Sequence, residues 1–214
     1  MFQGVVRLIF MNSFHTVTEV RWLDGILFYW LSWCGWITAF FLMKRSCLQA
    51  QLTIHLLIVI SLSQCHFVIL HERVNATFLY VLLLAFYFLK RFTIITLLYH
   101  MMCFLIIGMM YFLEQLYLLI DPSVLLLISP WMLCIPIVLL CHFLTKAFRK
   151  RLLASVIGMC WGEVLYSFAL NPLPHTIGSL AFLDNLGLTT SLIIAYHVLQ
   201  QALRRLKAHY TPSL

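Results

Sequence analysis

The stretch Ile157–Pro172, IGMCWGEVLYSFALNP, places Glu163 inside a run of apolar and small residues. Such a run is typical of a helix buried in a lipid bilayer, where an ionised acid near the helix centre costs about 3 kcal/mol. Acids in this setting usually face the interior of a helix bundle and are paired or protonated. The stretch therefore predicts a membrane-spanning helix whose carboxyl group meets other helices.

The composition of the whole chain agrees with this interpretation. Of its 214 residues, 63% are hydrophobic and only 10% are charged, whereas soluble chains carry about 25% charged residues. Apolar runs of about 20 residues, the length that crosses a bilayer as a helix, recur along the sequence. We therefore expect a multi-pass membrane protein with an all-α fold, a polytopic bundle of transmembrane helices without a soluble domain.

Charged and turn residues divide the apolar sequence into seven expected spans with short links. Their ranges are 24–43, 48–70, 74–89, 92–113, 123–145, 152–170 and 177–199.

The two ends of the chain flank a transmembrane bundle expected over 23–200. Segment 1–22 is apolar on part of a helical surface, and we expect an interfacial or disordered segment there. A translation start upstream of the natural one would give the same pattern. Residues 201–214 are expected to form a basic cytoplasmic tail.

Lys and Arg are distributed unequally between the two sides of this map. Basic residues near span ends are retained in the cytoplasm. Eleven fall on one side and three on the other, so we expect the N-terminus outside and the C-terminus inside. The net charge of +7 then needs no nucleic-acid partner, because topology and attraction to anionic lipids explain it. The three outer residues are Arg7, Arg21 and Arg73.

Recognised catalytic and cofactor motifs are missing. The sequence contains neither H-E-x-x-H nor G-x-S-x-G, and its seven Cys residues are scattered without C-x-x-C spacing. Haem ligation would need two His residues at one depth, whereas His55, His66 and His100 are expected at three different depths. We therefore predict no enzyme activity, no metal and no cofactor.

The first predicted span contains FYWLSW (residues 28–33) followed by WITAFFLMK (residues 36–44). With the chain length and the short-linked helical layout, these stretches resemble the YphA-like family of uncharacterised Bacillus-type integral membrane proteins. The resemblance implies a multi-pass protein of the bacterial plasma membrane and offers no catalytic residues to transfer. The segment before Leu23 departs from the family pattern.

Glu163 and Asp184 are the two acids that cannot be moved out of a span. Counting from the link NPLPH (residues 171–175) at 1.5 Å per residue puts both at roughly 12–13 Å depth, level with each other near the bilayer centre. Two level carboxyl groups could share a proton. Alternatively, each is a neutral group held by hydrogen bonds, for which Tyr166 and Ser167 are candidates beside Glu163.

Small residues predict how the last two spans pack. Ala154, Gly158 and Gly162 form a small-xxx-small ridge on the sixth span, and Gly187 and Ser191 lie on a small-residue stripe near Asp184. Packing of ridge against stripe would turn Glu163 sideways, toward a third helix.

Three functional hypotheses stay open from the sequence. The first is a structural, interaction or assembly component whose partners are the lipid bilayer and another membrane protein. The second is a small proton- or cation-coupled transporter that uses Glu163 and Asp184. The third is a membrane enzyme assembled from His100 and the acids.

Overall fold

The computed structural model describes the chain in five ranges: residues 24–69, 72–90, 92–120, 130–170 and 176–210. The predicted N-terminal segment 1–22 and the first part of the fifth predicted span lie outside these ranges.

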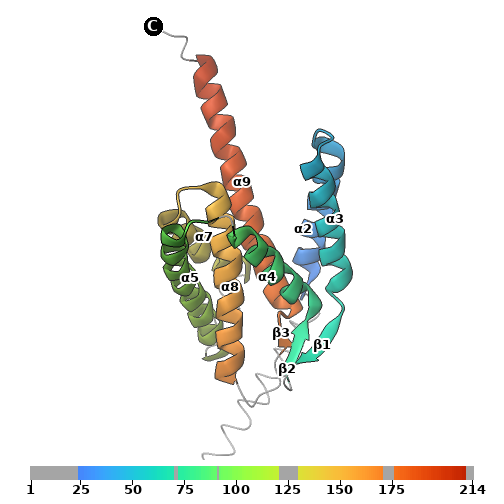
Figure 1. Cartoon of the computed structure of the whole chain (residues 1–214), viewed down its shortest axis with the longest axis vertical. Helices are drawn as coiled ribbons and strands as arrows, with labels where there is room; N and C mark the ends of the chain where they lie inside the picture. The colour runs from blue at the N-terminus through green and yellow to red at the C-terminus, as the bar shows by residue number, and fades with distance from the viewer. Residues whose placement is uncertain (1–23, 70–71, 91, 121–129, 171–175, 211–214) are drawn as a thin grey trace, which may run out of the picture.

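Seven α-helices make up most of the described residues, and each overlaps one predicted span (Figure 1). A π-helix, η2 (Thr38–Leu42), extends the first helix, and a 3-10 turn, η3 (Pro130–Leu133), precedes the fifth. The helices are α2 (Ile26–Ile37), α3 (Cys47–Leu62), α4 (Ala76–Leu89), α5 (Ile94–Ile120), α7 (Cys134–Leu144), α8 (Phe148–Leu170) and α9 (Leu180–Tyr210).

Three of these helices are long and apolar enough to cross a membrane by length and composition. They are α5, α8 and the Leu180–Lys207 part of α9. The other four described helices are apolar but shorter. The 14 residues of α4, for example, rise only about 21 Å.

A small sheet corrects the expectation of an all-α fold. Strands β1 (His66–Ile69) and β2 (Glu72–Asn75) pair antiparallel, and β3 (Thr176–Ile177) adds to β2 in parallel. The sheet joins the α3–α4 link to the start of α9. We call the end of the molecule that carries this sheet the sheet end. The opposite end, which carries the α2–α3 and α7–α8 links, is the basic end (Figure 1).

The second predicted span, 48–70, was wrong in its last part. Helix α3 ends at Leu62, and His66 lies on β1 rather than in a span. The buried Asn75 side chain explains the change, because its amide donates to the Ser63 carbonyl and its oxygen accepts from the Thr77 N–H. This side chain ends one helix and caps the next, which a count of apolar residues does not detect.

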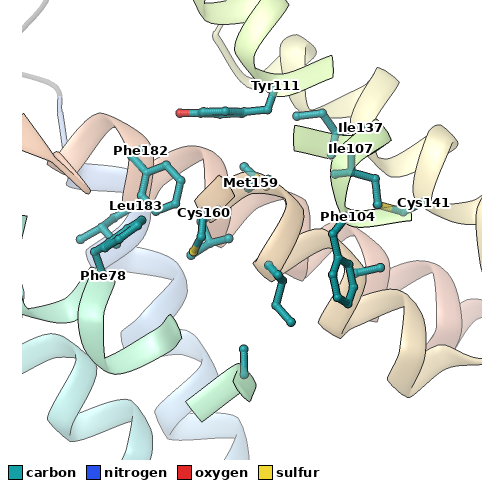
Figure 2. Close-up of a cluster of buried hydrophobic side chains, with 14 of the residues drawn as sticks. Phe78, Phe104, Ile107, Tyr111, Ile137, Cys141, Met159, Cys160, Phe182 and Leu183 are labelled. Carbon is teal, nitrogen blue, oxygen red and sulfur yellow. The ribbon is translucent and has the colours of Figure 1, made fainter. Parts of the chain in front are cut away.

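The core lies around α8, where side chains of α4, α5, α7 and α9 pack against it (Figure 2). Phe182 of α9 is central to it. Its ring lies 5.9 Å from the ring of Tyr111 on α5 and 5.6 Å from that of Phe78 on α4. Met159 and Cys160 of α8 are fully or almost fully buried beside them. Helix α8 is therefore the central element of the bundle.

Helices α5 and α8 approach each other closely at three glycines. A Cβ on Gly162 would lie 2.5 Å from the Gly108 carbonyl oxygen, and one on Gly158 would lie 2.7 Å from Ile107. A Cβ on Gly108 would lie 2.8 Å from the Gly158 carbonyl oxygen. Without side chains at these positions the two backbones can touch.

This arrangement differs from the predicted ridge-to-stripe packing of the last two spans. Gly158 and Gly162 of the predicted ridge meet α5, not α9, and Ala154 is fully buried. Gly187 of α9 instead faces α2, where a Cβ would lie 3.6 Å from Leu31. Ser191 donates to the Leu188 carbonyl of its own helix. The sequence identified small residues but not which neighbour each would meet.

Substitution of Gly162 by Ala tests the close contact. We expect Gly162→Ala to lower the free energy of unfolding by about 1–3 kcal/mol, because a methyl group there overlaps the α5 backbone. Gly35→Ala is the matched control, since its Cβ would meet only Leu56 at an ordinary 3.7 Å. Thermal unfolding in detergent measures both, and equal midpoints for the two variants would contradict the packing.

Candidate functional site

Asp184 of α9 binds the N-terminus of α2. Its Oδ2 accepts the Gly25 N–H at 2.6 Å, and its Oδ1 accepts the Phe28 N–H, also at 2.6 Å. The first N–H groups of a helix have no partner within the helix and carry partial positive charge. The side chain, 9% exposed, therefore caps a neighbouring helix.

Gly25 makes this contact possible. It is the N-cap residue of α2 with a φ of 90°, a conformation that glycine adopts at no steric cost, and its own side chain cannot supply a cap. A Cβ at this position would also lie 3.2 Å from Leu180. The start of α2 thus depends on a carboxylate that is more than 150 positions away in the sequence.

Glu163 of α8 is 2% exposed and connects two other elements. Its Oε2 accepts the Tyr111 hydroxyl of α5 at 3.1 Å, and its Oε1 accepts the Gly178 N–H at 3.2 Å. Gly178 has a φ of 73° and packs under Phe78, where a Cβ would lie 2.4 Å away. Its bare backbone brings the N–H to the carboxyl group just before α9 begins.

Further polar groups lie around this pair. The Tyr111 hydroxyl also interacts with the Asn185 side chain, and Tyr166 lies close enough to Glu163 for an electrostatic interaction. The Cys134 thiol lies 3.6 Å from the Asn185 carbonyl oxygen. Together Tyr111, Cys134, Glu163, Tyr166 and Asn185 form what we call the Glu163 cluster, built from α5, α7, α8 and α9.

The two acids are not arranged as the shared-proton hypothesis requires. Asp184 holds the start of α2, whereas Glu163 holds Tyr111 and Gly178. Asp184 lies about 6 Å along α9 from its start at Leu180, rather than the 12–13 Å counted from the link NPLPH, because the helix begins only at Leu180. Glu163 does turn toward a third helix, which is α5.

The other predicted site residues are dispersed. Ser167 is buried on α8, one turn beyond Glu163. His100 lies in the second turn of α5, about 16 Å along the helix from Tyr111, and its Nδ1 bonds the Thr96 carbonyl at 2.6 Å. The hypothesis of an enzyme built from His100 and the acids therefore lacks its geometry. Among the described residues, no three His, Cys, Asp or Glu side chains group as metal ligands.

Sequence reasoning missed Glu114 as an interior residue. The fourth span was predicted to end at 113, but α5 continues to Ile120, and Glu114 Oε1 is buried with no hydrogen-bond partner in the part of the chain that the structure describes. The apolar residues Leu116–Ile120 were the available signal. Tyr111 and Gly178 carried no comparable signal, because an aromatic in an apolar run and a glycine after a link are common.

Removal of the Asp184 cap tests its structural role. We expect Asp184→Ala to destabilise the protein by about 1–3 kcal/mol, because two buried N–H groups lose their acceptor. The stability of Asp184→Asn should lie between those of the wild type and Asp184→Ala, since its single carbonyl oxygen can accept only one of the two N–H groups. Thermal unfolding measures the loss of stability. The rate of amide hydrogen exchange at Phe28 measures the local effect at the start of α2. Ser191→Ala is the control on the same helix, and faster exchange in that variant too would count against the cap.

A double-mutant cycle tests the bond between α5 and α8. Tyr111→Phe and Glu163→Leu should be non-additive by about 1–3 kcal/mol, because either change removes the same hydrogen bond. Tyr29→Phe supplies the control, since its hydroxyl bonds Ser63 in another part of the protein. Unfolding free energies of the four variants give the coupling, and a value near zero would refute a stabilising bond.

Known proteins similar to this chain are integral membrane proteins. A family model described as YphA-like integral membrane protein matches residues 24–213. A Bacillus subtilis (strain 168) protein named "Uncharacterized protein YphA" is 27% identical over 156 residues, which cover 71% of this chain and 75% of that protein. No solved structure matches the chain. The resemblance in the first span is confirmed, and the chain belongs to the YphA-like integral membrane protein family.

Proposed function

We propose that this protein is a structural or assembly component of the bacterial plasma membrane, a non-enzymatic helix bundle that binds another membrane protein. The observation that carries the proposal is that both buried acids contribute to links between helices. Asp184 joins α9 to α2, and Glu163 joins α8 to α5 and to the start of α9. Acids used in this way stabilise one arrangement of helices, because each carboxyl group accepts donors from neighbouring elements.

All seven helices are proposed to span the bilayer, with the N-terminus outside and the C-terminus in the cytoplasm. Their alternating direction in Figure 1 supports this, as does the excess of Lys and Arg in the links at the basic end. Snorkelling of Lys90 at the end of α4 and local thinning of the bilayer accommodate the shorter helices. The basic end then faces the cytoplasm.

Helix α3 is the proposed contact for the partner. None of its residues is buried among the described residues of the chain, although α8 buries ten of its own. The hairpin of α2 and α3 stands at the edge of the bundle, and its upper part is separated from α9 in Figure 1. A helix with no buried residue leaves much of its surface available to a partner helix.

Photo-crosslinking from single positions tests this proposal in native membranes. A photoreactive residue in place of Ile54 on α3, which is 57% exposed, should give one discrete protein adduct, because a bound partner lies against it. The same residue in place of Met102 on α5, 56% exposed, is the matched control and should give none. Adducts from both positions, or from neither, would contradict a partner on α3.

A proton-coupled transporter is the second candidate, favoured by one observation. The buried Oε1 of Glu114 has no hydrogen-bond partner within the described ranges, and both Glu114 and Thr189 lie near Cys134 of the Glu163 cluster. A protonatable group with unused hydrogen-bonding capacity can exchange a proton or bind a cation.

Flux measurements separate the two candidates. If the protein is a transporter, liposomes that contain it should show a pH-dependent flux that Glu163→Gln abolishes and Ser191→Ala retains. The structural role predicts no flux above that of empty liposomes for any variant. A flux that depends on Glu163 would replace the structural proposal with the transport one.

A further inference from the structure

A pocket lies at the basic end, between the start of α8 and the C-terminal half of α9. Its volume is about 130 Å³, enough for several water-sized groups. Seven residues line it, and three of them carry a positive charge. They are Lys146, Phe148, Arg151, His197, Gln200, Gln201 and Arg204.

The positive charge of the pocket has no acidic counterpart in the surrounding elements. No Asp or Glu occurs in residues 122–162 or 185–214, which contain α7, the first half of α8 and nearly all of α9. Helix α5 contains one acid, Glu114, and it lies about 21 Å along the helix from His100, toward the sheet end. The cations of this pocket are therefore not neutralised by side chains of these helices.

Arg151 is the buried member of the group, with 6% of its surface exposed. Its Nε and Nη2 both donate to the Thr145 carbonyl, at 3.2 and 2.9 Å, which fixes the guanidinium at the wall of the pocket. The carbonyl is a neutral acceptor and leaves the positive charge uncompensated. A buried charge is costly without an opposite charge, so this position favours an anion nearby.

The backbone and the remaining side chains add to the preference for an anion. Phe148 is the first residue of the 23-residue helix α8, whose N-terminal N–H groups and dipole attract negative charge. The His197 ring stacks on Phe148 at 4.0 Å, and the Gln201 amide bonds the His197 Nε2 at 2.9 Å. These contacts order one wall, and Gln200 and Gln201 also line the pocket.

We propose that this pocket binds a phosphate group. Arg guanidinium groups match the geometry of phosphate oxygens, and Lys146 adds a point charge. The phosphate can be the headgroup of an anionic phospholipid or free inorganic phosphate, since both present the same oxygens. The proposal is independent of the partner on α3, because no residue of α3 lines the pocket and the chemistry is different.

Lipid binding in nanodiscs tests the pocket with matched pairs of variants. The protein is reconstituted in phosphatidylcholine with increasing phosphatidylglycerol, and retained lipid is counted by native mass spectrometry. The variant Lys146→Gln with Arg204→Gln removes two cations that line the pocket but leaves Arg151 and its contacts with Thr145. The control, Arg205→Gln with Lys207→Gln, removes two cations of α9 that do not line it.

We expect the pocket variant to weaken binding of phosphatidylglycerol by about tenfold or more and the control variant by less than threefold, because only the first pair touches the phosphate. Inorganic phosphate is titrated separately against thermal unfolding in pure phosphatidylcholine. A rise in midpoint that the pocket variant loses identifies free phosphate as a ligand, whereas selective phosphatidylglycerol binding without that rise identifies the lipid headgroup. Equal weakening in both variants, or no selective binding of either probe, would overturn the proposal.

Discussion

The contact between the backbones of α5 and α8 at Gly108 and Gly162 is the constraint on which the rest of the bundle depends. Tyr111 lies one turn beyond Gly108, and its ring occupies the space that a Gly162 side chain would fill, 2.9 Å from the position of a Cβ. Only because that space is free can the Tyr111 hydroxyl reach Glu163. The close packing at Gly108 and Gly162 thus determines that Glu163, the residue after Gly162, binds Tyr111.

The polar groups of the protein lie in two regions, one toward the sheet end and one at the basic end. Toward the sheet end, carboxyl groups accept N–H and O–H donors and hold helix starts and neighbours in place. At the basic end, cations gather around a pocket with no acid in the adjoining segments. In water such groups would be hydrated, but within a bilayer each must find its partner in the protein, the lipid headgroups or a bound ligand. This requirement accounts for the N–H and O–H donors that Glu163 and Asp184 accept, and for the phosphate that we propose in the cationic pocket.

Prediction of the fold from the sequence succeeded where the length of an apolar run was enough to identify a helix. Each predicted span overlaps a helix because about 20 apolar residues leave few alternatives to a helix in lipid. It failed at His66 and Glu114. His66 follows α3, which ends where the Asn75 side chain donates a hydrogen bond to the Ser63 carbonyl. Glu114 lies inside α5, which continues beyond it to Ile120. Boundaries of this kind depend on partners that a local window does not contain.

The sequence by itself determined the class of this protein, the approximate positions of its helices, the presence of two interior acids and the small residues that allow close packing. These features follow from composition and from spacing along a single helix. Only the tertiary structure decided that Asp184 caps α2, that Glu163 meets Tyr111 and Gly178, and that Gly158 and Gly162 face α5 rather than α9. The physical reason is that a hydrogen bond or a backbone contact acts over about 3 Å between atoms whose separation in the sequence can exceed one hundred residues, so spacing along the chain carries no information about it.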